Sequence, residues 1–307
     1  LGCTYVLVGH SERRINHKED DQVVNKKIRA ALANDLKPIL CIGEELAIRE
    51  AGNHISFVLE QLRNGLKGFH KPDLKKIVIA SSRSIYGEGK YIHPEFGAVY
   101  PNHRNEEDML AGNFEVTYNG HSNLKLVGTD EESKIHPSSV YGITKQNQEQ
   151  MIMTVCPTLG IAAVAFRYQN VYGPGQSLSN PYTGILSIFS TQIRNGNGIQ
   201  IFEDGKETRD FVFIDDVVNA TILGIENEKA NGETFNVGTG VAIDVLTVAN
   251  SLIKAYNVDV PVTVTGRFRL GDIRHNYADL SMLNKNDLEK HWVCYGRYEG
   301  RKYRNEL

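Results

Sequence analysis

Residues 76–82 read KIVIASS, and residues 161–168 read IAAVAFRY. Both are short apolar runs of the kind that predicts buried β-strands. Between them lies first a polar stretch, residues 91–137, and then a predicted helix. This helix begins near residues 138–139, where serines can cap it, and ends before Gly160. The polar stretch shows little periodicity, so we expect an insertion loop there. Strand, helix and strand in this order predict a parallel βαβ unit.

The alternation of helix and strand continues downstream and predicts an α/β fold. Amphipathic runs and short apolar runs follow one another along the chain. We expect a helix over residues 184–196, a strand over 199–205, a helix over 216–227, a strand over 234–240 and a helix over 245–256.

Upstream, the first seventy residues predict a βαβα piece. TYVLVG (residues 4–9) and PILCIG (residues 38–43) are the strand-like runs. Apolar residues recur at helical spacing between the two strands and again after the second strand. They are Val24, Ile28, Ala31 and Leu32 in the first helix, and Leu59, Leu62 and Leu66 in the second.

The composition is that of a globular protein. A chain of 307 residues corresponds to about two domains. The formal charge, 34 − 37 = −3, provides no basic field for nucleic acid or for anionic lipid. No apolar run approaches the roughly 20 residues that a membrane span needs. We therefore expect no nucleic-acid and no membrane partner.

The cysteine pattern predicts a reduced, cytoplasmic setting. Four cysteines are scattered without a CxxC pair, at Cys3, Cys41, Cys156 and Cys294. This favours neither a disulfide framework nor a metal site, and no signal peptide is visible. The chain opens at Leu1 and enters a strand-like run at once, which suggests a fragment.

A Tyr-x-x-x-Lys pattern places a phenol and an ammonium on one face of a helix. It occurs at Tyr86/Lys90, at Tyr141/Lys145 and at Tyr298/Lys302. The first and third copies contain internal glycines, which disfavour a helix. Only YGITK, residues 141–145, lies at a plausible helix start. Its function could be proton transfer, because a nearby cation makes a phenol a usable proton acceptor; the alternative is a solvated helix face.

Further motifs follow in order: IVIASSRSIYGEG, YGITK, RYQNVYGPGQ, FEDGKETRDFVFIDDVV, TFNVGTG and RFRLGDIRHNYAD. With them, residues 72–283 resemble an extended short-chain dehydrogenase/reductase of the NAD-dependent sugar-nucleotide epimerase/dehydratase group, of the dTDP-L-rhamnose 4-epimerase type. The resemblance implies a Rossmann-like parallel sheet with a small substrate-binding lobe, NAD as cofactor and a nucleotide sugar as substrate.

The resemblance also implies a set of site residues. Ser82, Tyr141 and Lys145 match the catalytic serine, the acid/base and its partner, and Tyr141 and Lys145 also contact the cofactor. The other matches are Tyr168 on the nicotinamide side, Asn170 at the sugar nucleotide, and Arg209 and Arg269 at its phosphates. Arginine suits phosphate because its planar fork binds two oxygens at once.

The mechanism that the resemblance implies is epimerisation by transient oxidation. Tyr141, hydrogen-bonded to Ser82, would take a proton from a sugar hydroxyl, while hydride passes to NAD⁺ and later returns to the other face. Arg83 and Ser84 stand where the 4,6-dehydratases of the family carry an acidic pair, which argues against dehydration.

The sequence lacks the glycine-rich turn of a dinucleotide site. Residues 1–75 contain neither GxGxxG nor GxxGxxG, so the Rossmann-like sheet is expected to be incomplete at its N-terminal side. VGHSERR and KPILCIGEELAIREAG instead make residues 1–69 resemble the middle of triosephosphate isomerase. That resemblance matches His10 to the electrophilic histidine and Glu12 to the neighbouring glutamate, and a βαβα piece is a quarter of such a barrel.

These observations predict three parts: a triosephosphate-isomerase-like fragment over residues 1–70, an epimerase-like domain over 71–288 and an irregular tail over 289–307. A chimera is the simplest origin of such a chain. The predicted function is an NAD-dependent nucleotide-sugar 4-epimerase, with a homodimer as the expected assembly. Two alternatives stay open: a non-catalytic scaffold or nucleoside-diphosphate-binding remnant, and a relic of triosephosphate isomerase.

Overall fold

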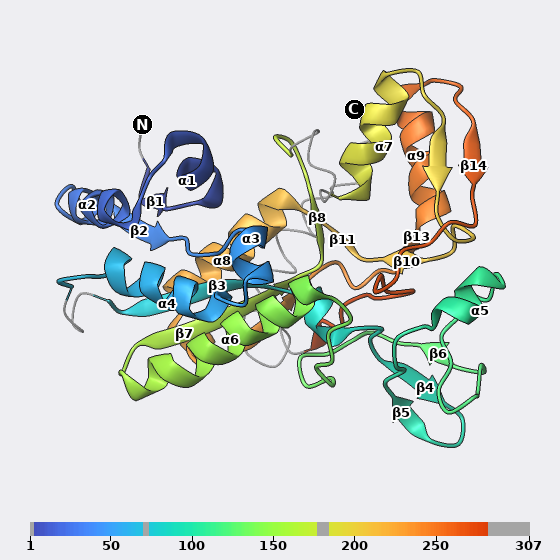
Figure 1. The fold of residues 1–307 in the computed structure, drawn as a ribbon, viewed down its shortest axis with the longest axis horizontal. Helices are drawn as coiled ribbons and strands as arrows, with labels where there is room; N and C mark the ends of the chain where they lie inside the picture. The colour runs from blue at the N-terminus through green and yellow to red at the C-terminus, as the bar shows by residue number, and fades with distance from the viewer. Residues whose placement is uncertain (1–2, 70–73, 177–183, 282–307) are drawn as a thin grey trace. The chain divides into compact units, whose positions relative to one another are not determined.

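The computed structural model describes residues 3–69, 74–176 and 184–281. The chain divides into two compact units, Leu1–Leu74 and Lys75–Leu307 (Figure 1). Each unit has its own sheet and its own apolar core. The predicted tail, residues 289–307, lies outside the described residues.

The smaller unit contains the predicted βαβα piece and two further short helices. Its elements are β1 (Tyr5–Val8), α1 (Ser11–His17), α2 (Asp21–Leu32), β2 (Lys37–Leu40), α3 (Leu46–Glu50) and α4 (His54–Gly65). β1 and β2 pair in parallel, from Tyr5↔Lys37 to Val8↔Leu40.

The packing of α2 explains why this segment folds as the apolar spacing predicts. The Asp20 carboxylate accepts a hydrogen bond from the Val23 backbone N–H at 2.8 Å and caps the helix. Val24 and Ile28, one turn apart, are buried against Val8 of β1. Burying each of these side chains stabilises the unit by about 1.5–3 kcal/mol.

The larger unit is built on a parallel sheet with the strand order β12-β7-β3. Its central elements are β3 (Lys76–Ser82), the 3₁₀ helix η1 (Arg83–Tyr86), α6 (Val140–Thr158), β7 (Ala162–Tyr168), α8 (Ile214–Glu226) and β12 (Thr234–Val237). The paired residues run from Lys76↔Ala162 to Ser82↔Tyr168 between β3 and β7. The predicted α/β class with parallel βαβ units is confirmed.

Helices cover both faces of this sheet, as consecutive residues of β7 show. The Arg167 side chain donates hydrogen bonds to Glu149 of α6, whereas the Tyr168 hydroxyl bonds to Thr221 of α8. In Figure 1, α6 accordingly lies in front of β7. Because side chains alternate along a strand, odd-numbered residues near the end of β7 face α6.

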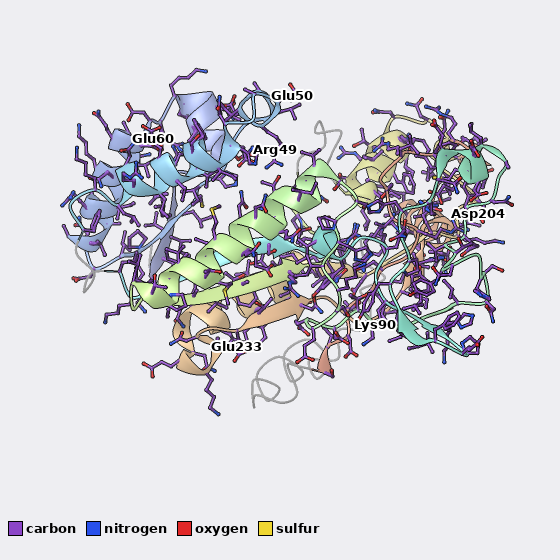
Figure 2. All side chains as sticks on the ribbon, turned by 60° about the horizontal axis from the view of Figure 1, so that its bottom comes forward. Arg49, Glu50, Glu60, Lys90, Asp204 and Glu233 are labelled. Carbon is purple, nitrogen blue, oxygen red and sulfur yellow. The ribbon has the colours of Figure 1, made fainter. Side chains whose placement is uncertain are left out.

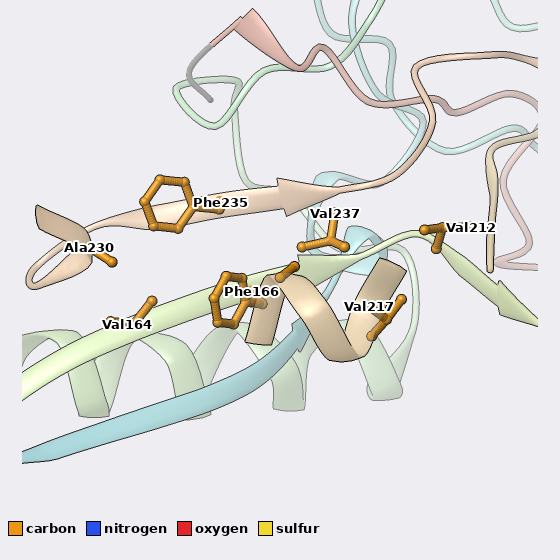
Figure 3. Close-up of a cluster of buried hydrophobic side chains, with 8 residues drawn as sticks. Val164, Phe166, Val212, Val217, Ala230, Phe235 and Val237 are labelled. Atoms are coloured by element: carbon orange, nitrogen blue, oxygen red, sulfur yellow. The ribbon is translucent and has the colours of Figure 1, made fainter. Parts of the chain in front are cut away.

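The core of the larger unit lies between the sheet and α8. Val164 and Phe166 of β7 pack with Phe235 of β12 and Val217 of α8, all of them buried (Figure 3). The rings of Phe166 and Phe235 lie 5.9 Å apart between centroids. This core fixes the carboxyl ends of β7 and β12 relative to each other.

A smaller lobe within the same unit has a second core around Phe189, Ile199 and Val248. β14 pairs with β9 and β11 with β8, both in parallel, while β10 and β13 are antiparallel. The remaining elements are β8 (Asn170–Tyr172), α7 (Ile185–Arg194), β9 (Ile199–Ile201), β10 (Thr208–Arg209), β11 (Phe211–Phe213), η2 (Glu228–Ala230), β13 (Ile243–Asp244), α9 (Val245–Tyr256) and β14 (Val262–Val264).

The prediction of an insertion loop over residues 91–137 is wrong in part. This stretch contains a three-stranded antiparallel sheet of order β5-β4-β6 and a short helix. The elements are β4 (Tyr91–His93), β5 (Gly97–Val99), α5 (Glu106–Leu110) and β6 (Lys125–Leu126). Its strands have two or three residues, too few for an alternating pattern to emerge, and Tyr91, Val99 and Val116 form a small core of their own.

Across the described ranges, no helix is both long and apolar enough to cross a membrane. The same residues contain no group of three or more histidine, cysteine, aspartate or glutamate side chains placed to hold a metal ion.

Candidate functional site

Ser82 lies where β3 ends and η1 begins. Its Oγ accepts a hydrogen bond from the Ser84 backbone N–H at 3.2 Å and donates one to the Ser84 Oγ at 3.1 Å. The serine therefore caps η1, and it is buried. Ligands of open parallel sheets bind at the carboxyl ends of the strands, so this junction is a candidate site.

The first turn of α6 is held tightly against η1. The Ser139 Oγ accepts a hydrogen bond from the Gly142 backbone N–H at 3.1 Å, which confirms the predicted helix start. A Cβ atom on Gly142 would lie only 2.5 Å from the Ser84 carbonyl oxygen. The glycine in YGITK is thus required by the close approach of two backbones.

This contact brings Tyr141 and Lys145 to the end of β3. The Lys145 Nζ donates a hydrogen bond to the Ala80 carbonyl oxygen at 2.9 Å and lies 5.8 Å from the centroid of the Tyr141 ring. Tyr141 is 56% exposed, so its hydroxyl can reach a ligand. The described residues show no hydrogen bond between Tyr141 and Ser82, whose hydroxyl bonds to Ser84 instead.

The first copy of the Tyr-x-x-x-Lys pattern has a structural position. Tyr86 is fully buried, its hydroxyl donates to the Asn236 Oδ1 at 2.8 Å, and it accepts from the Arg167 Nη1 at 2.7 Å. Burial raises the pKa of Tyr86, so this phenol does not serve as a proton acceptor near neutral pH. Lys90 forms an ion pair with another segment. The third copy, residues 298–302, lies outside the described residues.

Tyr168 and Asn170 follow at the carboxyl end of β7. The Tyr168 hydroxyl shares a 2.7 Å hydrogen bond with the Thr221 Oγ1, and burial raises its pKa. The Asn170 backbone N–H donates to the Asp210 carbonyl oxygen at 2.9 Å, but its side-chain Oδ1 is buried and finds no hydrogen-bond partner among the residues that the structure describes. That oxygen is free to accept from a ligand.

The two predicted phosphate-binding arginines differ in their surroundings. Arg209 is buried and donates to the carbonyl oxygens of Ile273 and Arg274 and, at 3.2 Å, to the Asp272 Oδ1. Arg269 is exposed, and its guanidinium lies 5.1 Å from the centroid of the Phe202 ring. Arg209 therefore holds the loop of residues 272–274, whereas Arg269 has donors that face solvent.

An ionic network around the buried Arg274 also holds this loop. The fully buried Arg274 forms ion pairs with Glu115, Glu203 and Asp204 (Asp204 is labelled in Figure 2). Both terminal nitrogens of Arg104 donate hydrogen bonds to the Glu203 carboxylate, each at 2.8 Å. Arginine forks suit such paired contacts, and the network ties the 91–137 stretch to the lobe.

Two further polar residues, Arg83 and Gln169, lie at the same strand ends. The sequence pattern gives no reason to single out Gln169, and it marks Arg83 only as a departure from the dehydratase motif. Arg83 is half-buried beside Ser82, and Gln169 is buried beside Asn170. Only the three-dimensional arrangement shows that these side chains make no hydrogen bond within the described ranges.

His10 and Glu12 belong to the smaller unit. His10 precedes α1 without a side-chain capping hydrogen bond, and Glu12 lies in the first turn of that helix. Both are exposed. The described contacts give neither side chain a catalytic partner within this unit.

The comparisons with known proteins divide the chain in the same way. Residues 117–238 match the model of the NAD dependent epimerase/dehydratase family, and residues 1–82 match the model of triosephosphate isomerase. Both resemblances that the sequence motifs indicate are therefore confirmed.

Individual relatives agree with the family models. A dTDP-L-rhamnose 4-epimerase from Burkholderia thailandensis is 37% identical over 212 residues, which are 69% of this chain and 57% of that protein. A triosephosphate isomerase from Mycobacterium ulcerans is 56% identical over 80 residues, which are 26% of this chain and 31% of that protein. The chain thus spans little more than half of the first relative and about a third of the second.

The fold resembles that of an NAD-dependent epimerase. The crystal structure of a UDP-glucuronic acid 4-epimerase from Bacillus cereus, in complex with UDP-glucuronic acid and NAD, superposes with a TM-score of 0.63 at 21% identity. The superposition covers 88% of this chain and 74% of that one. At this identity the likeness shows the Rossmann-like fold.

Proposed function

We propose that the larger unit is part of a nucleotide-sugar 4-epimerase, an isomerase in which Tyr141 and Lys145 carry out the proton transfer. The observation that carries the proposal is the position of this pair. Lys145 is anchored to the Ala80 carbonyl oxygen at the end of β3, and the exposed Tyr141 stands one helical turn before it. The 37% identity to an epimerase over 212 residues supports the same reaction class.

The proposed chemistry follows from the side chains themselves. The Tyr141 hydroxyl is exposed and can exchange a proton with a sugar hydroxyl, and the Lys145 ammonium lies 5.8 Å from the centroid of its ring. Ser82 has a hydroxyl at the same strand end that can orient the sugar. Asn170, whose Oδ1 is unpaired, and Arg269, whose guanidinium is exposed, are proposed to bind the nucleotide and its diphosphate. Arg209 is proposed as a positioning residue, because its guanidinium donates hydrogen bonds to carbonyl oxygens of the loop of residues 272–274.

The matched family is described as NAD dependent and the Bacillus cereus structure contains NAD, but the described residues fit only one end of this cofactor. Tyr141 and Lys145 offer a phenol and an ammonium to the nicotinamide half. A diphosphate needs a strand-to-helix turn with open space above its glycines. Residues 75–281 contain neither GxGxxG nor GxxGxxG.

Because residues 75–281 lack this motif, a second candidate function is that the larger unit binds a nucleotide sugar without turning it over. The polar groups at the strand ends would be the same, but the hydride acceptor would be lacking. For triosephosphate isomerisation, by contrast, no described contact of His10 or Glu12 speaks in favour.

Titration and turnover together test the proposal. The full chain is titrated with dTDP-L-rhamnose and UDP-glucuronic acid and then incubated with each plus NAD⁺, while NMR follows the C4 epimer. Epimer formed by the wild type and lost in a folded Tyr141→Phe variant is the expected result. Binding without turnover selects the second candidate. No binding of either nucleotide sugar overturns both.

A further inference from the structure

Gln169 carries a buried amide that makes no hydrogen bond to any residue of the described part of the chain. Its side chain is 5% exposed, and neither Nε2 nor Oε1 has a hydrogen-bond partner among the described residues. Burying an amide without hydrogen bonds costs free energy, so most buried polar groups are paired. An orphaned amide at the carboxyl end of a parallel strand therefore points to a ligand that supplies the missing bonds.

Arg83 and Gln169 both lie at the carboxyl end of the parallel sheet. Ser82 and Tyr168 are the last paired residues of β3 and β7, and Arg83 and Gln169 each follow one residue later. The Gln169 backbone N–H still bonds to the Val237 carbonyl oxygen, so the chain remains extended there. Alternation puts its side chain on the face that α6 covers, the face that also carries Tyr141.

Arg83 has unused donors. Within the described part of the chain, its guanidinium makes no hydrogen bond and no ion pair. Burial and the neighbouring Arg209 lower its pKa to about 10, while Asp272, Tyr141 and Asp210 are close enough to act in the opposite direction. Arg83 therefore remains a cation at neutral pH.

The nearby carboxylates are occupied by other donors. Asp210 accepts from the backbone N–H groups of Thr239, Gly240 and Ala278. Asp272 accepts from Arg209 and from the backbone N–H of Ile273. Among the described residues neither carboxylate accepts a hydrogen bond from Arg83, which leaves its planar fork available to oxygen atoms of a bound molecule.

We propose that Arg83 and Gln169 bind the sugar moiety of the nucleotide sugar and so determine which sugar is accepted. This inference rests on the proposed function. A guanidinium only donates hydrogen bonds, whereas an amide both donates and accepts. Together they fit a ligand that presents acceptor oxygens to Arg83 and a hydroxyl group, which donates and accepts, to Gln169. A sugar ring beside Tyr141 offers both.

The experiment compares each nucleotide sugar with its own nucleoside diphosphate. Wild type, Arg83→Met, Arg83→Lys and Gln169→Leu are titrated with dTDP-L-rhamnose and dTDP, and with UDP-glucuronic acid and UDP. We expect Arg83→Met and Gln169→Leu to weaken the binding of a nucleotide sugar by about 10- to 100-fold, with the diphosphate affinity unchanged. Arg83→Lys keeps the charge without the fork, so it should lie in between.

The melting temperature of the free protein is a second measurement. It distinguishes a ligand-binding role of Gln169 from a purely structural one. Gln169→Leu removes an unsatisfied amide and should raise the melting temperature of the free protein by a few degrees. The matched control is Gln61→Leu, another buried glutamine, whose Oε1 accepts from the Gly43 backbone N–H at 2.9 Å. That substitution should lower the melting temperature of its own unit.

The possible results distinguish a failure of the sugar-binding inference from a failure of the proposed function. Equal losses for the nucleotide sugar and its diphosphate would assign Arg83 to the phosphates and overturn the inference. So would unchanged affinities in the variants, or a fall in the melting temperature of Gln169→Leu. A wild type that binds no nucleotide sugar would instead overturn the proposed function itself.

Discussion

Gly142 approaches Ser84 so closely that a Cβ atom on the glycine would lie 2.5 Å from the serine's carbonyl oxygen. This contact sets the first turn of α6 against η1. It thereby determines where Tyr141 and Lys145 stand relative to the end of β3. The geometry of the candidate site depends on a residue that has no side chain.

Gly142→Ala should disturb the site and the fold together. In an open helix, alanine stabilises by about 1 kcal/mol relative to glycine. Here the added methyl group meets backbone, and we expect a loss of about 1–3 kcal/mol in the free energy of unfolding and weaker binding of nucleotide sugars. Urea denaturation and titration measure the two effects. In the control, Gly65→Ala, the methyl group meets only side-chain methyl groups, of Leu40 at 3.2 Å and of Val24 at 3.9 Å. Equal stability of Gly142→Ala and wild type would contradict the account.

Tyr86→Phe and Tyr141→Phe should separate two copies of one sequence pattern. Tyr86→Phe removes buried hydrogen bonds to Asn236 and Arg167, so we expect it to destabilise the protein by about 1–3 kcal/mol. Tyr141→Phe removes an exposed hydroxyl and should leave stability within about 0.5 kcal/mol. Chemical denaturation of both variants is the measurement. A larger loss in Tyr141→Phe would show that the roles are reversed.

Local patterns in the sequence predicted the elements that build the site. The KIVIASS and IAAVAFRY strands and the serine-capped start of YGITK are found where periodicity and capping place them. Spacing alone also separated Tyr141 from Tyr86, because the glycines after Tyr86 disfavour a helix.

Contacts distant in the sequence could not be predicted in this way. The carbonyl oxygens that accept hydrogen bonds from Arg209 come from residues 273 and 274. The unpaired amide of Gln169 is recognised only once the residues around it are known. The short strands of residues 91–137 carry too few residues for an alternating pattern. The cytoplasmic setting, the homodimer and the chimeric origin remain predictions of the sequence.

The two arginines should respond differently to substitution. Arg209→Met removes the donor of the buried Ile273 carbonyl oxygen and one of the two donors of the Arg274 carbonyl oxygen, so we expect a loss of about 2 kcal/mol in stability and weaker nucleotide binding. Arg269→Met should weaken nucleoside diphosphate binding while stability stays within about 0.5 kcal/mol, because the side chain is exposed. Thermal unfolding with dTDP titration measures both. If Arg209→Met unfolds at the wild-type temperature, the positioning role is wrong.

Glu88→Gln should change how stability depends on pH. Burial raises the pKa of Glu88 to about 7, against the opposing effect of Arg104 and of the Arg274 backbone N–H. A carboxyl whose pKa is raised in the folded state binds more protons folded than unfolded, so stability falls as pH rises from about 4.5 to 7. We expect Glu88→Gln to remove this fall and to be the more stable protein at pH 8, by on the order of 1–3 kcal/mol. Urea denaturation at pH 5 and pH 8 measures it.

Glu115→Gln is the matched control with the opposite sign. The hydrogen bond from His275 and the bonds and charge of Arg274 lower the pKa of Glu115 to about 2, although burial acts against them. Its contribution to stability is present above pH 4.5 and is lost as pH falls toward 2. Glu115→Gln should therefore be less stable than wild type at pH 7. A parallel pH dependence in the two variants would contradict the assignment.

Calorimetric titration of the intact chain with dTDP-L-rhamnose, UDP-glucuronic acid and the two parent diphosphates tests the central claim most directly. We expect at least one nucleotide sugar to bind more tightly than its parent nucleoside diphosphate, because polar groups at the ends of β3 and β7 contact the sugar. If neither sugar adds affinity over dTDP or UDP, the carboxyl ends of these strands do not form a sugar-binding site.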